Sequence, residues 1–389
     1  MTVSRLHIAS NEAMPSQRNF EIRKMQFIRD RSILLLLTVT FSLCAQAAAP
    51  ADWKPECIGR SRVLLPSDVE TAALSSESVA EEITERSRHS VSQFRDGQGA
   101  GWSRITYLNG LLLVSNELDG EQIADLRSLF RNQPELEREY LKKRNTTKSL
   151  ATVVTDVKLS SPQVLWWSYD SHTLYLQQLQ NHFLITGFTS DGETLGESNE
   201  TFDFFAKNTN YREMFSIPSG SGVCLPFVFI RDKGSEQRKI SMSYRIKSHP
   251  DVMVVLTDSS AEKPDEAMES FVQTPEYKIN DFWSQYEVSR TGKSVSSRWP
   301  VSPAHSVEMD GRKGIASFVN ITRKDDSKDF GYFAIVPGDP KAKSDTPELR
   351  LFVVREANHA RAKGIEPIGD TAFLELVEQI ASSVQVRRN

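Results

Sequence analysis

Cysteine is scarce in this chain of 389 residues, which contains only Cys44, Cys57 and Cys224. No CxxC pair occurs. The histidines after residue 47 have no other histidine, cysteine or carboxylate at a recognised ligand spacing; they are His89, His172, His182, His249, His305 and His359. Protein metal sites use such residues at short, regular spacings. The sequence therefore predicts neither a metal site nor a cofactor.

Motifs that mark hydrolases are also missing, because neither HExxH nor GxSxG occurs. Ser221 lies between Gly220 and Gly222, but the surrounding SGSGV is more typical of a linker than of a nucleophile elbow. Adjacent carboxylates such as Asp325 and Asp326 are common on any solvated surface. We therefore predict no enzyme and no catalytic residues. A hydrolase whose active site combines distant residues is the alternative.

The chain also lacks an excess of basic residues. Its formal net charge is −4, and residues 48–389 carry 41 basic against 48 acidic side chains, a net charge near −7. A protein that binds nucleic acid needs a basic face to neutralise phosphates. The composition therefore predicts no nucleic-acid partner.

Only one long apolar run is present, ILLLLTVTFSLCAQAAA at residues 33–49. Basic residues precede it and small residues follow it, which is the order of a secretory signal peptide. Its apolar part, residues 33–43, is shorter than the ~20 residues of a transmembrane helix. We therefore predict a signal peptide at residues 1–47, cleaved near Ala47, with Met25 or Met14 as alternative starts. The mature protein would be soluble in the periplasm, without stable membrane insertion.

Cys44 offers a second interpretation, in which an acylated cysteine anchors an envelope lipoprotein. Lipidation motifs place Gly, Ala or Ser before the cysteine, whereas this chain has Leu43, so the soluble form is favoured. Cleavage would leave Cys57 and Cys224. In an oxidising compartment an even pair is more often bonded than free, so we favour a disulfide over two buried thiols.

About 340 mature residues exceed what one hydrophobic core usually serves. The SGSG stretch at residues 219–222 is the clearest linker, so we expect domains at residues 48–215 and 216–389. The predicted class is α+β, with a mainly antiparallel sheet and packed helices in each domain.

Hydrophobic periodicity predicts the following elements. In the first half we expect a strand at 62–65, a helix at 77–94, a hairpin at 105–114 turning at Asn109–Gly110, a helix from Asp119 that Pro134 ends, a short helix at 136–141, strands at 152–158, 164–169, 173–179 and 182–189, and a helix at 200–215. In the second half we expect strands at 223–230, 239–247, 252–257, 314–321, 331–336 and 349–355, a helix start at 268–271, and a final helix at 371–384 capped by Asp370 or Thr371.

Two features are candidates for an interaction surface. Trp166 and Trp167 are adjacent, so on a strand they point to opposite faces. Burial of both is the favoured interpretation, and exposure of one at an interface is the alternative. The acidic stretch at residues 81–85 is the other candidate, although such a run usually faces solvent. The sequence does not identify interface residues.

A C-x-G-R segment (Cys57, Gly59, Arg60) near the mature start and a G-x-C segment (Gly222, Cys224) at the start of the second half each adjoin an apolar run. With the export signal, these motifs resemble the periplasmic immunity proteins that neutralise type VI secretion phospholipase effectors, namely the fourth class of Tle-cognate immunity proteins. The resemblance extends over the whole mature chain in organisation.

The resemblance implies a two-domain protein that clamps a cognate phospholipase effector in the periplasm and keeps lipid from its catalytic serine. It carries over no contact residues. Gly59 and Gly222 are expected to permit turns, and Arg60 to pair locally. The competing hypotheses are a periplasmic hydrolase and an envelope scaffold.

Overall fold

The computed structural model describes residues 50–84, 90–143, 158–161, 163–169, 172–189, 195–261, 274–289, 295–323, 326–342 and 346–388. The predicted signal peptide, Cys44, residues 152–157 and the helix start expected at 268–271 lie outside these ranges. The stretch from Ala47 to Asn389 forms one compact unit. The division into domains at residue 216 therefore stays a prediction.

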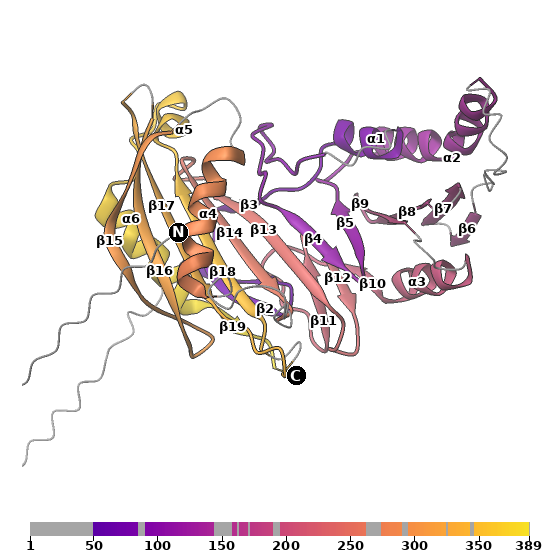
Figure 1. Ribbon diagram of the computed structural model, residues 1–389. Coiled ribbons are helices and arrows are strands. Elements are labelled where there is room, and N and C mark those ends of the chain that lie inside the picture. Colours follow the sequence, from indigo (N-terminus) through magenta and orange to yellow (C-terminus); the bar gives the residue numbers. More distant parts are fainter. Residues whose placement is uncertain are drawn as a thin grey trace, which may run out of the picture. The chain divides into compact units, whose positions relative to one another are not determined.

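Strands contribute more residues to the described structure than helices do (Figure 1). They are β1 Trp53–Ile58, β2 Ser61–Pro66, β3 Val69–Thr71, β4 Arg104–Tyr107, β5 Gly110–Val114, β6 Lys158–Ser161, β7 Val164–Tyr169, β8 His172–Leu179, β9 His182–Thr189, β10 Thr209–Tyr211, β11 Gly222–Leu225, β12 Val228–Arg231, β13 Arg238–Ile246, β14 Val252–Ser259, β15 Val295–Met309, β16 Arg312–Arg323, β17 Lys328–Val336, β18 Glu348–Arg355 and β19 Gln385–Val386.

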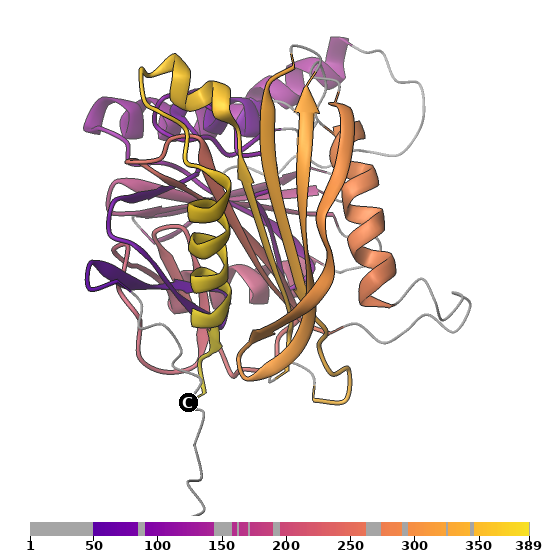
Figure 2. The same ribbon diagram turned by 90° about the vertical axis from the view of Figure 1, so that its left-hand side faces the viewer.

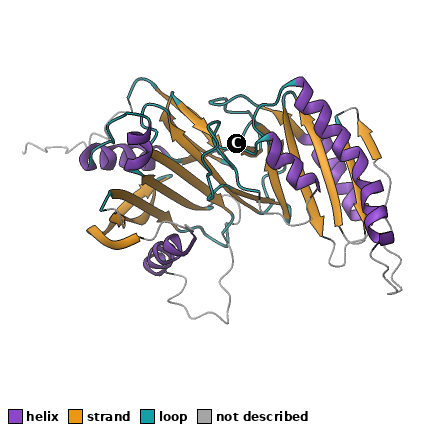
Figure 3. Ribbon diagram, turned by 90° about the horizontal axis from the view of Figure 1, so that it is seen from above, coloured by secondary structure: helices purple, strands orange, loops and turns teal. Residues whose placement is uncertain are grey.

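The described helices are α1 Ser76–Thr84, α2 Gly120–Lys143, α3 Leu195–Asn208, α4 Pro275–Ser289, α5 Ala357–Ala362 and α6 Asp370–Ser383. The predicted α+β class is confirmed. Helices (purple in Figure 3) pack against strands of both halves.

One large antiparallel sheet runs through both halves in the order β15-β16-β17-β18-β14-β13-β4-β5-β9-β8-β7-β6, and β3 also pairs with β13. Strand β13, from the second half, pairs with β14 and with β4 from the first half. Two small sheets, β1-β2-β19 and β10-β12-β11, flank the large one. The halves are thus joined by backbone hydrogen bonds as well as by side chains.

Alternation along the strands gives the large sheet two buried faces. Tyr175 and Ala334 belong to the core that contains α3 and α6, whereas their neighbours Leu176 and Phe333 face the cores that contain α1, α2 and α4. Figure 2 shows α6 and α4 on either side of strands β15 to β18. Trp166 and Trp167 are both buried, one on each face, as the favoured interpretation predicted.

The predicted strands 164–169 and 182–189 match β7 and β9, and the final helix matches α6 within a residue. Phe373, Val377 and Ile380 are buried as expected. The predicted cap is wrong: the N-cap is Gly369 and makes no side-chain capping bond. Packing of the apolar face is enough to hold this helix without a cap.

Two helix predictions are wrong. Helix α1 ends at Thr84, and Phe94 does not continue it, because Gln93 bridges Ala73 and Gly99 while the Phe94 ring is drawn into the core. Helix α2, by contrast, continues through Pro134. A proline inside a helix removes one intrahelical bond and its ring crowds the carbonyl of the preceding turn, and burial of Phe130 and Pro134 offsets this cost.

The predicted N-terminus of α2 holds. Asp119 Oδ1 accepts a bond from the Gln122 backbone N at 2.9 Å, and Gln122 Oε1 accepts one from the Asp119 backbone N at 3.0 Å. This reciprocal pair satisfies two donors at the start of the helix.

Turn chemistry corrects two more predictions. The 105–114 hairpin forms, but its turn is Leu108–Asn109, whose φ values are 49° and 61°, and Gly110 already pairs with Tyr107. The expected strand 223–230 is a hairpin of β11 and β12, because Phe227 adopts a φ of 56°. Strand β15 and helix α4 were not predicted from the sequence.

Candidate functional site: a stapled junction and an arginine-lined groove

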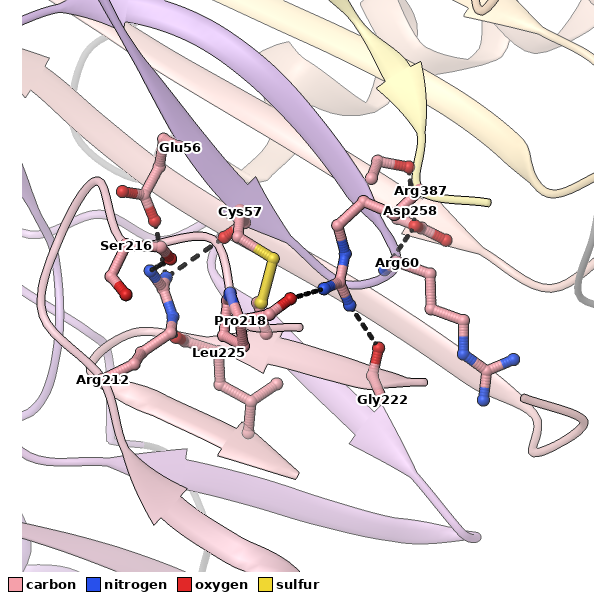
Figure 4. Close-up of a disulfide and its surroundings, with 12 residues drawn as sticks. Glu56, Cys57, Arg60, Arg212, Ser216, Pro218, Gly222, Leu225, Asp258 and Arg387 are labelled. Atoms are coloured by element: carbon pink, nitrogen blue, oxygen red, sulfur yellow. Dashed lines mark hydrogen bonds and ion pairs between the residues drawn. A yellow bond between two sulfur atoms is a disulfide. The ribbon is translucent and has the colours of Figure 1, made fainter. Parts of the chain in front are cut away.

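The residues of the two family-like motifs come together at one place, which we call the junction: Cys57, Gly59, Arg60, Gly222 and Cys224. Figure 4 shows Cys57, Arg60 and Gly222 around the disulfide. A disulfide joins Cys57 and Cys224, whose Cα atoms are 5.7 Å apart. Gly59 and Cys224 exchange two backbone hydrogen bonds of 2.8 Å. The first strand of the described chain is thereby fixed to the start of the second half.

Both glycines of the junction are needed for close approach, not only for turning. Gly59 has a φ of +55°, and a Cβ there would lie 2.9 Å from the side chain of Asp258. Gly222 has a φ of +154°, and a Cβ there would lie 2.4 Å from the carbonyl oxygen of Ile230. Any larger residue must displace neighbouring atoms at either position.

Arg60 does not pair locally, which corrects the expectation. Its Nη2 lies 2.6 Å from Asp232 and 3.1 Å from Glu236, more than 170 residues along the chain, and its Nη1 donates to the carbonyl of Gly234. Tyr107 also donates to Asp232, at 2.6 Å. Burial, and then the Asp232 carboxylate, raise the pKa of Tyr107, so it stays a neutral donor.

Two further ion pairs beside the junction are almost fully buried. Arg212 pairs with Glu56 at 2.5 Å, and it also donates to the carbonyls of Cys57 and Leu225. Arg238 pairs with Asp258 at 2.7 Å. Asp258 also accepts bonds from the backbone N of Arg60 and from the hydroxyl of Ser61. Buried charges of this kind are tolerated only when paired and hydrogen-bonded.

A recess of about 730 Å³, which we call the groove, lies beside the junction. Its walls come from β2 at Arg62, from residues 217–220, from the turn Asp310–Gly311 and from residues 385–388. These four segments are far apart in sequence. The C-terminal segment is held in place because Arg387 N donates to the Arg60 carbonyl at 2.7 Å and Val386 N donates to Asp310 at 3.0 Å.

Among the described residues that line this groove are three guanidinium groups and one carboxylate. Arg387 donates to the carbonyls of Pro218 and Gly222 at 2.9 and 2.6 Å, and burial lowers its pKa (Figure 4). Arg62 donates to the neutral Oε1 of Gln385, and Arg388 lies 3.1 Å from Asp310. The described lining of the groove therefore carries more positive than negative charge.

The other candidate interface residues do not form a site. Trp166 and Trp167 are only 5% and 4% exposed, so the interpretation of one of them as an exposed interface residue is wrong. Within 81–85, Glu82 is buried and accepts a bond from Ser90 N, while Glu81 is exposed. Sequence reasoning missed the groove, for which the adjacent Arg387 and Arg388 were the one local signal.

Within the described ranges, no three His, Cys, Asp or Glu side chains are placed to hold a metal ion. None of the described helices has the length and hydropathy needed to cross a bilayer. His182, one of the described histidines, stacks on Phe227 at 4.3 Å and on Tyr211 at 5.6 Å, and burial lowers its pKa. This histidine therefore packs as a neutral aromatic side chain.

Comparison with known proteins gives one family match and several structural matches. Residues 216–389 match the family described as the Tle cognate immunity protein 4 C-terminal domain. No curated protein sequence matches the chain.

The immunity protein TplEi of the type VI secretion system from Pseudomonas aeruginosa, solved with an "L" peptide, is 13% identical over 87% of this chain and 99% of its own, with a TM-score of 0.53. The apo structure of TplEi is 14% identical over 86% of this chain and 97% of its own, with a TM-score of 0.53. A chain in the structure of the Tle4-Tli4 complex is 14% identical over 86% of the present chain and 98% of its own, with a TM-score of 0.51. At this identity the likeness is one of fold.

Proposed function

We propose that this chain is an immunity protein that binds and inhibits a phospholipase effector of a type VI secretion system, because its residues 216–389 match the Tle cognate immunity protein 4 C-terminal domain family. The family match is the observation that carries this proposal. The fold shared with TplEi and with a chain of the Tle4-Tli4 complex supports it over nearly the whole mature chain.

We infer that inhibition is steric and that the chain acts by binding, not by catalysis. A clamp of residues 48–215 and 216–389 around the effector would cover the route by which lipid reaches the catalytic serine. Stable complexes of this kind bury about 1,200–2,000 Å². The disulfide and the buried ion pairs of the junction support the proposal, since a surface that is already rigid loses less entropy on binding.

The proposed location is the periplasm, after cleavage near Ala47. A disulfide between Cys57 and Cys224 suits an oxidising compartment. The mass of the exported protein tests this part directly: a mature chain starting at Ala48 supports cleavage, whereas a diacylated Cys44 at the N-terminus would replace it with the lipoprotein alternative.

The function is tested by protection. A candidate phospholipase effector is directed to the periplasm of a test bacterium with and without this protein, and lipase activity of the purified pair is titrated. We expect rescue of growth and complete inhibition near one equivalent. Absence of binding to every candidate lipase, together with esterase activity of the purified chain, would replace the immunity proposal with the hydrolase alternative.

A further inference from the structure

We propose that the groove is an effector-binding subsite that receives an acidic segment of the effector, whose carboxylates pair with Arg62 and Arg388. The inference rests on the proposed function, because it names the chemistry of the partner surface. It concerns residues that lie outside both family-like motifs.

The charges of the groove carry the inference. Asp310, the groove carboxylate, already accepts from Val386 N at 3.0 Å and lies 3.1 Å from Arg388 and 3.6 Å from Arg312. Arg62 is exposed and donates to a neutral amide oxygen. Arg388 has 74% of its side chain exposed. Two accessible guanidinium groups can therefore take carboxylates from another molecule while the fold keeps its own contacts.

The size and lining of the groove favour a peptide segment over a single small anion. Its volume of about 730 Å³ lies in the range of ligand sites, about 300–1,000 Å³, and far exceeds one carboxylate. Ile217 and Pro218 add apolar surface to the wall. Guanidinium groups bind carboxylates through two parallel N–H···O bonds, which fixes orientation as well as charge.

The charge of the whole chain argues against an anionic membrane as the occupant. Residues 48–389 carry a net charge near −7, so an anionic bilayer repels the protein as a whole. The positive charge is gathered in a recess between four segments, whereas binding to lipid head groups uses an open basic face. An acidic protein segment fits a recess, and the membrane is kept as an outcome of the test.

The test compares two variants with the same change in charge. R62E/R388E reverses both accessible arginines of the groove, and R104E/R131E reverses two exposed arginines on β4 and α2. Helix α2 contacts β7, near the end of the large sheet opposite to the β15–β16 turn that carries Asp310. Equal melting temperatures verify that both variants fold.

Binding is measured for the inhibited effector, for a hexaglutamate peptide with hexaglutamine as its control, and for vesicles that contain phosphatidylglycerol. We expect R62E/R388E to bind the effector about 100-fold more weakly, at about tenfold for each lost charge pair, and R104E/R131E to bind as the unaltered protein does. Hexaglutamate is expected to bind the unaltered protein and R104E/R131E, but not R62E/R388E.

Unchanged effector binding by R62E/R388E overturns the proposal, and so does an equal loss in R104E/R131E. Vesicle binding without hexaglutamate binding overturns it in favour of a lipid site. If the unaltered protein binds no effector, the proposed function fails, and the hexaglutamate comparison alone decides whether the groove takes acidic segments.

Discussion

The buried arginines at and beside the junction and the two accessible arginines of the groove, Arg62 and Arg388, have opposite surroundings. Arg60, Arg212 and Arg238 are at most 6% exposed, and each is paired with a carboxylate. Arg62 follows Arg60 by two residues, yet it faces solvent and donates to a neutral amide. The first group can hold the fold, and the second is accessible to a partner.

The difference has a simple energetic basis. A guanidinium that loses its water must regain the lost interactions from protein groups, so each buried arginine of the junction is tied to acids and carbonyls. An exposed arginine stays hydrated and contributes little to the stability of the fold. It can contribute to binding when a partner displaces that water. Substitutions in the two regions should therefore separate stability from binding.

Removal of the disulfide is expected to have the largest effect on stability. It closes a sequence separation of 167 residues, for which the loop-entropy relation gives about 5 kcal/mol. C57S/C224S should lower the free energy of unfolding by about that amount, measured by urea denaturation. Dithiothreitol should lower the stability of the unaltered protein to the same value and leave C57S/C224S unchanged. Equal stability of the two proteins without reductant would contradict the prediction.

Asp258→Asn should cost about 3–4 kcal/mol, because Arg238 would lose its carboxylate while remaining fully buried. Glu117→Gln is the matched control, since its pair with Arg95 is exposed on both sides and should change stability by less than about 0.5 kcal/mol. Similar losses in the two variants, measured by urea denaturation, would mean that burial does not distinguish these ion pairs.

Gly222→Ala is expected to cost about 2 kcal/mol, because its Cβ would meet the Ile230 carbonyl oxygen at 2.4 Å in a backbone conformation that disfavours side chains. Gly220→Ala is the control. It also has a positive φ, +85°, but no atom of the described residues lies within 4 Å of its Cβ, so only the backbone cost of about 1 kcal/mol applies. Thermal unfolding of both variants measures the difference, which vanishes if crowding at Gly222 is unimportant.

The dependence of stability on pH tests the ion pair of Asp96 with Arg245, whose exposure is intermediate. Burial raises the pKa of Asp96, but hydrogen bonds from Lys363 and Arg245 outweigh it and hold this pKa below its usual 3.8. The lowered pKa means that this carboxylate stabilises the fold above the unfolded-state value and that its contribution shrinks as the pH falls below it. Because 38% of its side chain is exposed, Asp96→Asn should cost less than about 1 kcal/mol at pH 7. Urea denaturation at pH 7 and pH 3 should show a smaller deficit at pH 3, and an equal deficit would contradict the assignment.

The smallest expected effect is that of the groove itself. Arg62→Gln and Arg388→Gln should each change the free energy of unfolding by less than about 0.5 kcal/mol, because neither side chain is buried. Chemical denaturation of the two single variants gives the values. A loss above about 1.5 kcal/mol would show that these arginines hold the fold, and it would remove the contrast between the two regions.

The sequence by itself determined the elements that depend on one buried face. Strands β7 and β9 and helix α6 could be read directly, because periodicity of apolar residues records which side of an element is covered. The sequence also predicted a disulfide between Cys57 and Cys224, and its short motifs indicated the family. These are local or compositional properties, and no knowledge of distant contacts is needed to read them.

Only the tertiary structure decided what depends on segments far apart in the chain. The partners of Arg60 lie more than 170 residues away, and the groove combines four separate segments. Packing likewise lets α2 continue past Pro134. A positive φ at Phe227 divides the predicted strand 223–230 into β11 and β12. Local propensities are worth about 1 kcal/mol or less per residue, and about 3 kcal/mol for a proline inside a helix, whereas burial of each large apolar side chain contributes about 1.5–3 kcal/mol and an element buries several of them. Long-range packing therefore decides wherever the two disagree.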